Sequence, residues 1–93
     1  MFARVSIIQG KPDRIDEVVR FLDKSIPRGM EGTKGVYVLV NRKTGNFMSI
    51  SLWETEKAMQ ASASIGNKIR GQAAETAAAA PATVKIYEVA LQL

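Results

Sequence analysis

A turn sequence between two apolar runs is the feature that most constrains this chain. The runs are GVYVLV at 35–40 and FMSISLWE at 47–54, with NRKTGN between them. Glycine adopts the left-handed backbone conformation without strain, so Gly45 suits the last position of a three-residue hairpin loop, Lys43-Thr44-Gly45. The segment from Gly35 to Met59 therefore predicts a β-hairpin that leads into a helix.

A loop of this length fixes which side chains share a face of the hairpin. With Arg42 opposite Asn46, one face carries the pairs Val40–Met48, Val38–Ile50 and Val36–Leu52. Because side chains alternate across a strand, these six residues form a continuous apolar face. The other face carries the pairs Gly35–Trp53, Tyr37–Ser51, Leu39–Ser49 and Asn41–Phe47.

The two faces predict two different neighbours. The apolar face suits flat packing on another sheet, whereas the aromatic and polar face suits a partly open cavity. We expect five side chains of this second face to contact a small ligand: Trp53, Tyr37, Asn41, Ser49 and Ser51. The other interpretation, that Ser49 and Ser51 only leave room for a packed helix, stays open at this point.

The remaining segments complete one α+β unit. Residues 2–9 alternate as a strand, and an apolar stripe after Pro12 predicts a helix that ends near Pro27, Gly29 and Gly32. Thr55 suits the N-cap of a second helix. We expect Gly66-Asn67 to interrupt this helix, and we expect its end at the alanines 77–80 to pack closely on a neighbour. Residues 83–93 read as a long last strand. This order predicts a ferredoxin-like βαββαβ sandwich over residues 1–93, with a four-stranded antiparallel sheet and helices on one face.

Composition excludes several classes of function. The 93 residues include neither cysteine nor histidine, which removes thiolate and imidazole ligands, so we expect no metal. The net charge of +4 is scattered among acidic residues, and we expect no nucleic-acid partner. No apolar run approaches membrane-spanning length and no signal-peptide pattern is present, so we expect a cytoplasmic protein without membrane contact.

The uncovered sheet face predicts a partner. If the helices cover one face only, the other exposes a contiguous apolar surface that is too large for a monomer. A two-fold dimer with the sheets face to face would bury it. We expect a homodimer through six side chains: Val36, Val38, Val40, Met48, Ile50 and Leu52.

Three segments resemble the antibiotic biosynthesis monooxygenase superfamily, the dimeric α+β barrels. They are the Gly35 start of the second strand, the Thr44-Gly45-Asn46 turn, and Ser51-Leu52-Trp53-Glu54-Thr55 running into Glu56-Lys57-Ala58-Met59. The resemblance implies that Trp53 faces a cavity between sheet and helices and that the opposite sheet face forms a dimer. It also implies oxygen insertion into an electron-rich aromatic or quinol without metal or flavin.

The haem-degrading branch of this superfamily is not expected. That branch uses a histidine about ten residues past the tryptophan, where this chain has Ser62-Ala63-Ser64, and an asparagine in the first strand, where we align Ala3. Two functions remain: a cofactor-independent monooxygenase for a small aromatic or quinol-type substrate, or a non-catalytic dimeric protein that binds a small ligand or a partner. No residue stands out as a general base, and the catalytic residues stay unassigned.

Overall fold

The computed structural model describes residues 1–28 and 30–93, so Gly29 of the expected connection lies outside the described residues. The elements are β1 (Phe2–Gln9), the 3-10 turn η1 (Pro12–Arg14), α1 (Ile15–Ser25), β2 (Thr33–Val40), β3 (Asn46–Trp53), α2 (Glu56–Ala61), α3 (Ala63–Thr76) and β4 (Thr83–Glu88).

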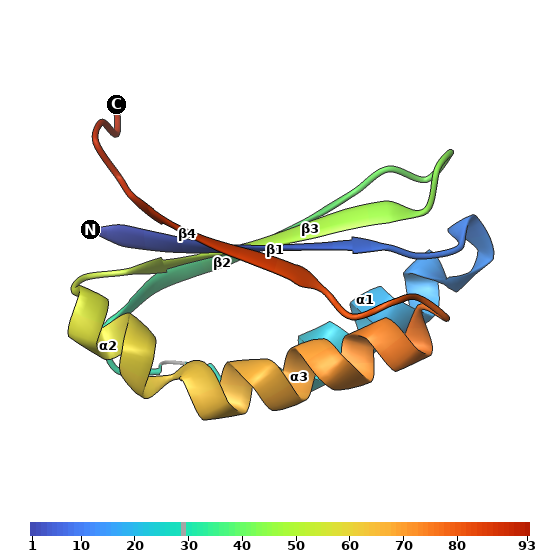
Figure 1. Ribbon diagram of the computed structural model, residues 1–93, viewed down its shortest axis with the longest axis horizontal. Helices are drawn as coiled ribbons and strands as arrows, with labels where there is room; N and C mark the ends of the chain where they lie inside the picture. The colour runs from blue at the N-terminus through green and yellow to red at the C-terminus, as the bar shows by residue number, and fades with distance from the viewer. Residues whose placement is uncertain (29) are drawn as a thin grey trace.

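The four strands form one antiparallel sheet in the order β2-β3-β1-β4. Figure 1 shows α1, α2 and α3 on the same side of this sheet, and no helix on the other side. Strands β1 and β2 are parallel to each other with β3 between them, so the connection through α1 crosses one strand. This is the expected ferredoxin-like arrangement, and the expected fold class is confirmed.

The alternation expected for β1 is also confirmed. Arg4, Ser6 and Ile8 lie on the side of the helices, which we call the helix face; all three are buried. Val5 and Ile7 point to the opposite side, which we call the open face. From the strand register, the apolar and aromatic residues of the open face are Ala3, Val5, Ile7, Tyr37, Leu39, Met48, Ile50, Leu52 and Tyr87, and Gly35, Thr83 and Lys85 lie on the same face.

The expected register of the hairpin is wrong by one residue. Val40 pairs with Phe47, Val38 with Ser49 and Val36 with Ser51. The three valines therefore belong to the helix face, and Val38 packs against the hydrophobic core. Tyr37 and Leu39 take their place beside Ile50 and Met48 on the open face. The six residues predicted for the dimer surface are thus divided between the two faces.

The loop explains the shift. Asn41 and Asn46 close the hairpin, with the Asn41 N–H donating to the Asn46 carbonyl at 2.8 Å, so the loop has four residues, 42–45. The Asn41 side chain accepts hydrogen bonds from the N–H groups of Lys43 and Thr44, at 3.0 and 3.3 Å, and so stabilises the wider turn. Gly45 has the expected left-handed φ of 78°. One additional loop residue moves every β2 side chain to the opposite face.

The helices bury one side against the helix face. Val18 and Leu22 of α1 meet Ile8, Phe47 and Ala73 in the core. This layer of apolar contacts places the inner surfaces of α1 and α3 opposite the middle of β1 and β3.

The second helical segment begins as expected and breaks earlier than expected. The Thr55 side chain caps α2 by accepting from the Ala58 N–H at 3.0 Å. The break falls at Ser62, and α3 continues through Gly66. At its end Ala77 is buried and lies against Gly10, where a Cβ would come within 2.9 Å of the Ala77 methyl group. The close packing expected for the alanine run therefore holds for Ala77, whereas Ala78 and Ala80 are exposed.

The last strand is shorter than the sequence predicted. Strand β4 ends at Glu88, and the residues after it run to the side of the sheet that carries no helix (Figure 1). The Val89 N–H still donates to the Met1 carbonyl at 2.8 Å, but Leu91 and Leu93 are exposed. No helix among the described residues is both long and apolar enough to cross a bilayer.

Candidate functional site

A cavity of about 90 Å³ lies between the helix face of the sheet and the inner sides of α1 and α3. It has room for several water molecules or a single small ring, and it is smaller than most closed drug-sized pockets, which hold roughly 300–1,000 Å³. The lining residues are Arg4, Ser6, Ile8, Leu22, Ile26, Pro27, Met30, Thr33, Val36, Phe47, Ser49, Ser51, Trp53, Ser62, Ile65, Gly66, Ile69, Arg70 and Ala73.

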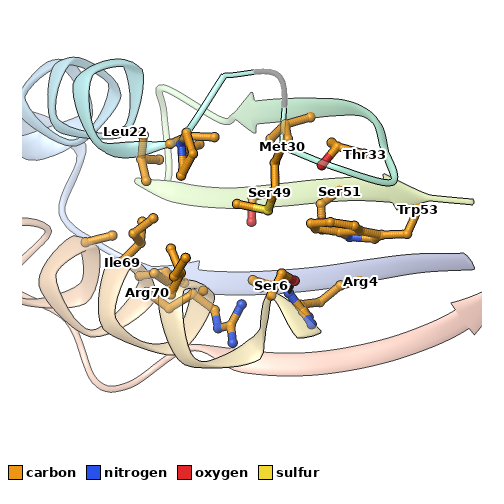
Figure 2. A pocket seen from close by; sticks show the side chains of 18 of the residues that line it. Arg4, Ser6, Leu22, Met30, Thr33, Ser49, Ser51, Trp53, Ile69 and Arg70 are labelled. Carbon is orange, nitrogen blue, oxygen red and sulfur yellow. Dashed lines mark hydrogen bonds between the residues drawn. The ribbon is translucent and has the colours of Figure 1, made fainter. Parts of the chain in front are cut away.

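Trp53 forms one wall at the end of β3. Its side chain is 4% exposed, and its indole Nε1–H donates to the Ser51 Oγ at 2.9 Å. Figure 2 shows the two side chains next to each other on β3, with Ser49 one pleat further along. Because the Ser51 oxygen accepts the hydrogen bond from the indole, the Ser51 hydroxyl can still donate a hydrogen bond to a neighbour.

A bulge at the start of β2 brings Thr33 to the same cavity. Thr33 pairs with Trp53 and Gly35 with Leu52, so Lys34 is an additional residue in the strand. Without it, Thr33 and Val36 would point to opposite faces, because they are three residues apart. The Thr33 Oγ1 is buried and has no hydrogen-bond partner. Such an atom in a cavity wall is typical of a position that a ligand or an ordered water satisfies.

Arg4 is the charged group of the wall contributed by β1. It is 6% exposed and donates to the Ser62 Oγ at 3.1 Å and to the Met59 carbonyl at 2.5 Å. Its guanidinium carbon lies 5.8 Å from the centre of the Trp53 ring, within the range of a cation–π contact. Burial lowers the pKa of Arg4, because desolvation penalises the charged form.

A second guanidinium, that of Arg70 on α3, lies beside the first. A Cβ at Gly66 would be 3.0 Å from Nη1 of Arg70 and 3.2 Å from Nη1 of Arg4, so both groups approach the same point of the α3 backbone. Figure 2 shows the two side chains along the same side of the cavity. Burial, and secondly the charge of Arg4, lower the pKa of Arg70. Its protein hydrogen bond goes to the Asn67 side chain on the same helix.

No carboxylate among the described residues pairs with either arginine. The ion pairs of residues 1–28 and 30–93 are Arg14–Glu17, Arg28–Asp23, Lys34–Glu54 and Arg42–Asp16. The described part of the chain also holds no group of three or more acidic side chains that could bind a metal. The cavity wall therefore combines apolar and hydroxyl groups with two cations and no acid.

The structure brings together three of the five site residues predicted from the sequence. Trp53, Ser49 and Ser51 line the cavity. Tyr37 lies on the open face, where it is 59% exposed, and Asn41 caps the hairpin loop. Tyr37 was expected opposite Ser51 and Asn41 opposite Phe47. Both expectations depended on the wrong register, and neither residue lines the cavity.

Sequence reasoning missed the polar groups that the other segments contribute to the cavity: Arg4, Ser6, Thr33, Ser62 and Arg70. Arg4 carried a signal, since it alternates with Ser6 and Ile8 on the strand face opposite Val5. Ala3, which we aligned with the first-strand asparagine of the haem-degrading branch, lies on the open face, so β1 offers Arg4 to the cavity instead. Thr33 depends on the bulge and gave no signal.

The fold is shared by solved structures over nearly the whole chain. The haem-degrading MhuD of Mycobacterium tuberculosis, with two haems in its active site, superposes with a TM-score of 0.73 over 100% of this chain and 99% of its own at 22% identity. SnoaB of Streptomyces nogalater, a cofactor-independent oxygenase crystallised as a mutant, has a TM-score of 0.69 over 99% of this chain and 95% of its own at 14% identity. A Deinococcus radiodurans protein assigned provisionally to the antibiotic biosynthesis monooxygenases has a TM-score of 0.77 over 100% of this chain and 96% of its own, at 14% identity.

This chain has the antibiotic biosynthesis monooxygenase fold. The resemblance expected from the hairpin and from Trp53 is confirmed at this level, and so is the monooxygenase-type architecture. No family model matches the sequence. Among curated proteins, the uncharacterized protein Rv2557 of Mycobacterium tuberculosis H37Rv is 37% identical over 97% of this chain. The alignment covers 41% of that protein, so the chain spans about two fifths of its curated relative.

Proposed function

We propose that the chain is a cofactor-independent monooxygenase for a small aromatic or quinol-type molecule, held in the cavity beside Trp53. The observation that supports this most is the buried wall formed by Trp53, whose indole N–H is bonded to Ser51, in a cavity that is otherwise lined largely by apolar residues. A flat ring can stack there, while hydroxyl groups at Ser49 and Thr33 offer hydrogen bonds to substituents.

The proposed reaction needs only the substrate and dioxygen. A hydroquinone plus O₂ gives a hydroxyquinone plus water: one oxygen atom forms a new bond to a ring carbon, and the other leaves as water. The substrate supplies all four electrons, which it does most readily when one hydroxyl is ionised. The protein then contributes shape, exclusion of bulk water and hydrogen bonds, in keeping with a wall that has neither carboxylate nor imidazole.

Oxygen uptake tests the proposal. With single-ring hydroquinones, 1,4-benzenehydroquinone and its methyl derivative, we expect the protein to consume oxygen faster than the buffer and to form the hydroxyquinone, identified by mass. Trp53→Phe should lower the rate at least about tenfold, since a smaller ring repositions the substrate. Tyr37→Phe is the matched aromatic control on the open face and should retain the rate. Uptake equal to the buffer for every quinol would contradict the proposal.

The alternative is a non-catalytic protein of the same fold that binds a small ligand. One observation favours it: Arg4 and Arg70 are the only ionisable side chains among the described lining residues, so the wall holds no general base. Under this alternative a quinol binds, seen as a change in Trp53 fluorescence, and no oxygen is consumed.

We also propose that the open face forms a homodimer, with a composition that differs from the one expected from the sequence. Tyr37 and Leu39 replace the three valines, next to Ile50 and its neighbours on β3. Tyr37 and Leu39 on β2 and Tyr87 on β4 are each more than half exposed, and they lie on the two edge strands of a face that carries no helix among the described residues (Figure 1). An apolar surface of this extent is typical of a protein interface.

A further inference from the structure

The cavity wall carries two positive charges that the described residues leave without a counter-ion. Arg4 is buried and Arg70 is half-buried, and both approach Gly66 closely enough that their charges repel each other. Desolvated charges are normally paired with an opposite charge, because a buried charge without a partner is destabilising. Among the described residues, the hydrogen-bond partners of the two guanidinium groups are a carbonyl, a hydroxyl and an amide oxygen. An anion that entered the cavity would balance this local charge.

Hydrogen bonding supports the same conclusion. A guanidinium has five N–H donors, and the bonds to Ser62 and Met59 use two of those of Arg4. Across the cavity, the Thr33 Oγ1 is buried without a partner, and Figure 2 shows Trp53 between Thr33 and Arg4. Unused donors on one side of the tryptophan and an orphaned hydroxyl on the other indicate a ligand with polar groups at two edges of an aromatic ring.

We propose that Arg4 and Arg70 form an anion-binding subsite, so that the ligand of this cavity carries an ionised oxygen, such as a carboxylate, phenolate or enolate, on its ring. Planar guanidinium groups suit such oxygens because they donate two parallel, charge-assisted hydrogen bonds. The subsite belongs to the cavity of the proposed function, and it also explains how a wall without a base could hold an ionised substrate. Binding beside two cations lowers the pKa of a ring hydroxyl, whose proton leaves to water.

A charged and a neutral probe of the same shape test this subsite. Benzoate and benzamide differ in charge and hardly in size, and the single tryptophan of the chain, Trp53, reports binding by its fluorescence. We expect benzoate to bind roughly tenfold more tightly, because its hydrogen bonds to guanidinium are charge-assisted. Arg70→Gln should remove most of this preference, and because the hydrogen bond of Arg70 is to Asn67 of its own helix, we expect the variant to fold.

Lys68→Gln is the matched control, because it removes one positive charge from an exposed position on the same helix. It should leave the benzoate-to-benzamide ratio unchanged. Arg4→Lys keeps the charge but loses the planar donors, and we expect an intermediate ratio; native circular dichroism checks that this buried position still folds. Equal affinities for the two probes, no binding of benzoate, or equal effects of Arg70→Gln and Lys68→Gln would each overturn the subsite.

The two proposals fail in different ways. A benzoate preference that depends on Arg70, without oxygen uptake from quinols, supports the subsite and contradicts the monooxygenase. Oxygen uptake from quinols with equal binding of benzoate and benzamide supports the monooxygenase and contradicts the subsite.

Discussion

Arg4 combines a structural and a proposed binding role in one side chain. Its bonds to the Met59 carbonyl and the Ser62 hydroxyl connect β1 to the junction of α2 and α3, where the same carbonyl also accepts hydrogen bonds from the N–H and the hydroxyl of Ser62. The same guanidinium lies near the ring of Trp53. A substitution of Arg4 therefore changes stability and binding together, and Arg70 is the better residue for separating the two effects.

Next to the cavity mouth, Lys34 and Glu54 provide a pH-dependent pair. Their side chains are 2.6 Å apart, and the hydrogen bond from Lys34, followed by its charge, lowers the pKa of Glu54. A lowered folded-state pKa means that the pair stabilises the protein above the ordinary glutamate pKa, and that this contribution is lost as pH falls through the lowered value. Lys34→Met should return the pKa of Glu54 towards its ordinary range.

Carboxyl NMR titration measures this change. The Glu54 signal should shift its midpoint upward in Lys34→Met, while Lys24→Met, an exposed change on α1, should leave it in place. An identical midpoint in the wild type and in Lys34→Met would show that the contact does not persist in solution.

At the scale of elements, the end of α3 is a place where local sequence and backbone conformation disagree. Ala78 has a φ of 54°, and the Ala79 N–H donates to the Ala74 carbonyl at 2.9 Å, the pattern that usually places glycine at this position. We expect Ala78→Gly to raise the free energy of unfolding by about 0.5–1 kcal/mol, because relief of the strained conformation exceeds the added freedom of the unfolded chain.

Urea unfolding compares this variant with Ala80→Gly. Ala80 is exposed and has no positive φ, so its change to glycine should leave the stability unchanged or lower it. If Ala78→Gly also destabilised the protein, the left-handed end of α3 would not describe the molecule in solution.

For the whole molecule, the exposed apolar residues of the open face are the reason to expect a second copy of the chain packed on it. Ile50 lies in the middle of this face, between Val5 of β1 and Tyr37 of β2. We expect the wild type to elute with twice the mass of the 10.1 kDa chain, and Ile50→Glu to elute as a monomer, since a buried unpaired carboxylate opposes association.

Light scattering coupled to size exclusion measures both masses. Arg20→Glu places the same charge on an exposed position of α1, away from the open face, and should leave the dimer intact. A wild-type monomer at micromolar concentration would contradict the homodimer.

The sequence by itself determined the order of elements, the strand β1 with its two faces, the cap at Thr55 and the position of Trp53 at the end of β3. These follow from local rules: period-two alternation, a side chain that accepts an N–H, and a turn glycine. The faces of β2 were decided only by the tertiary structure. All positions from Val36 to Val40 are apolar or aromatic, so the hydrophobic pattern is compatible with either pairing of β2 and β3. The length of the hairpin loop, four residues instead of three, decides which pairing forms. The pairing of Arg4 with Arg70 needed the structure for the same reason: sixty-odd residues separate them in sequence, and only the packing of α3 on β1 brings two charges to one cavity.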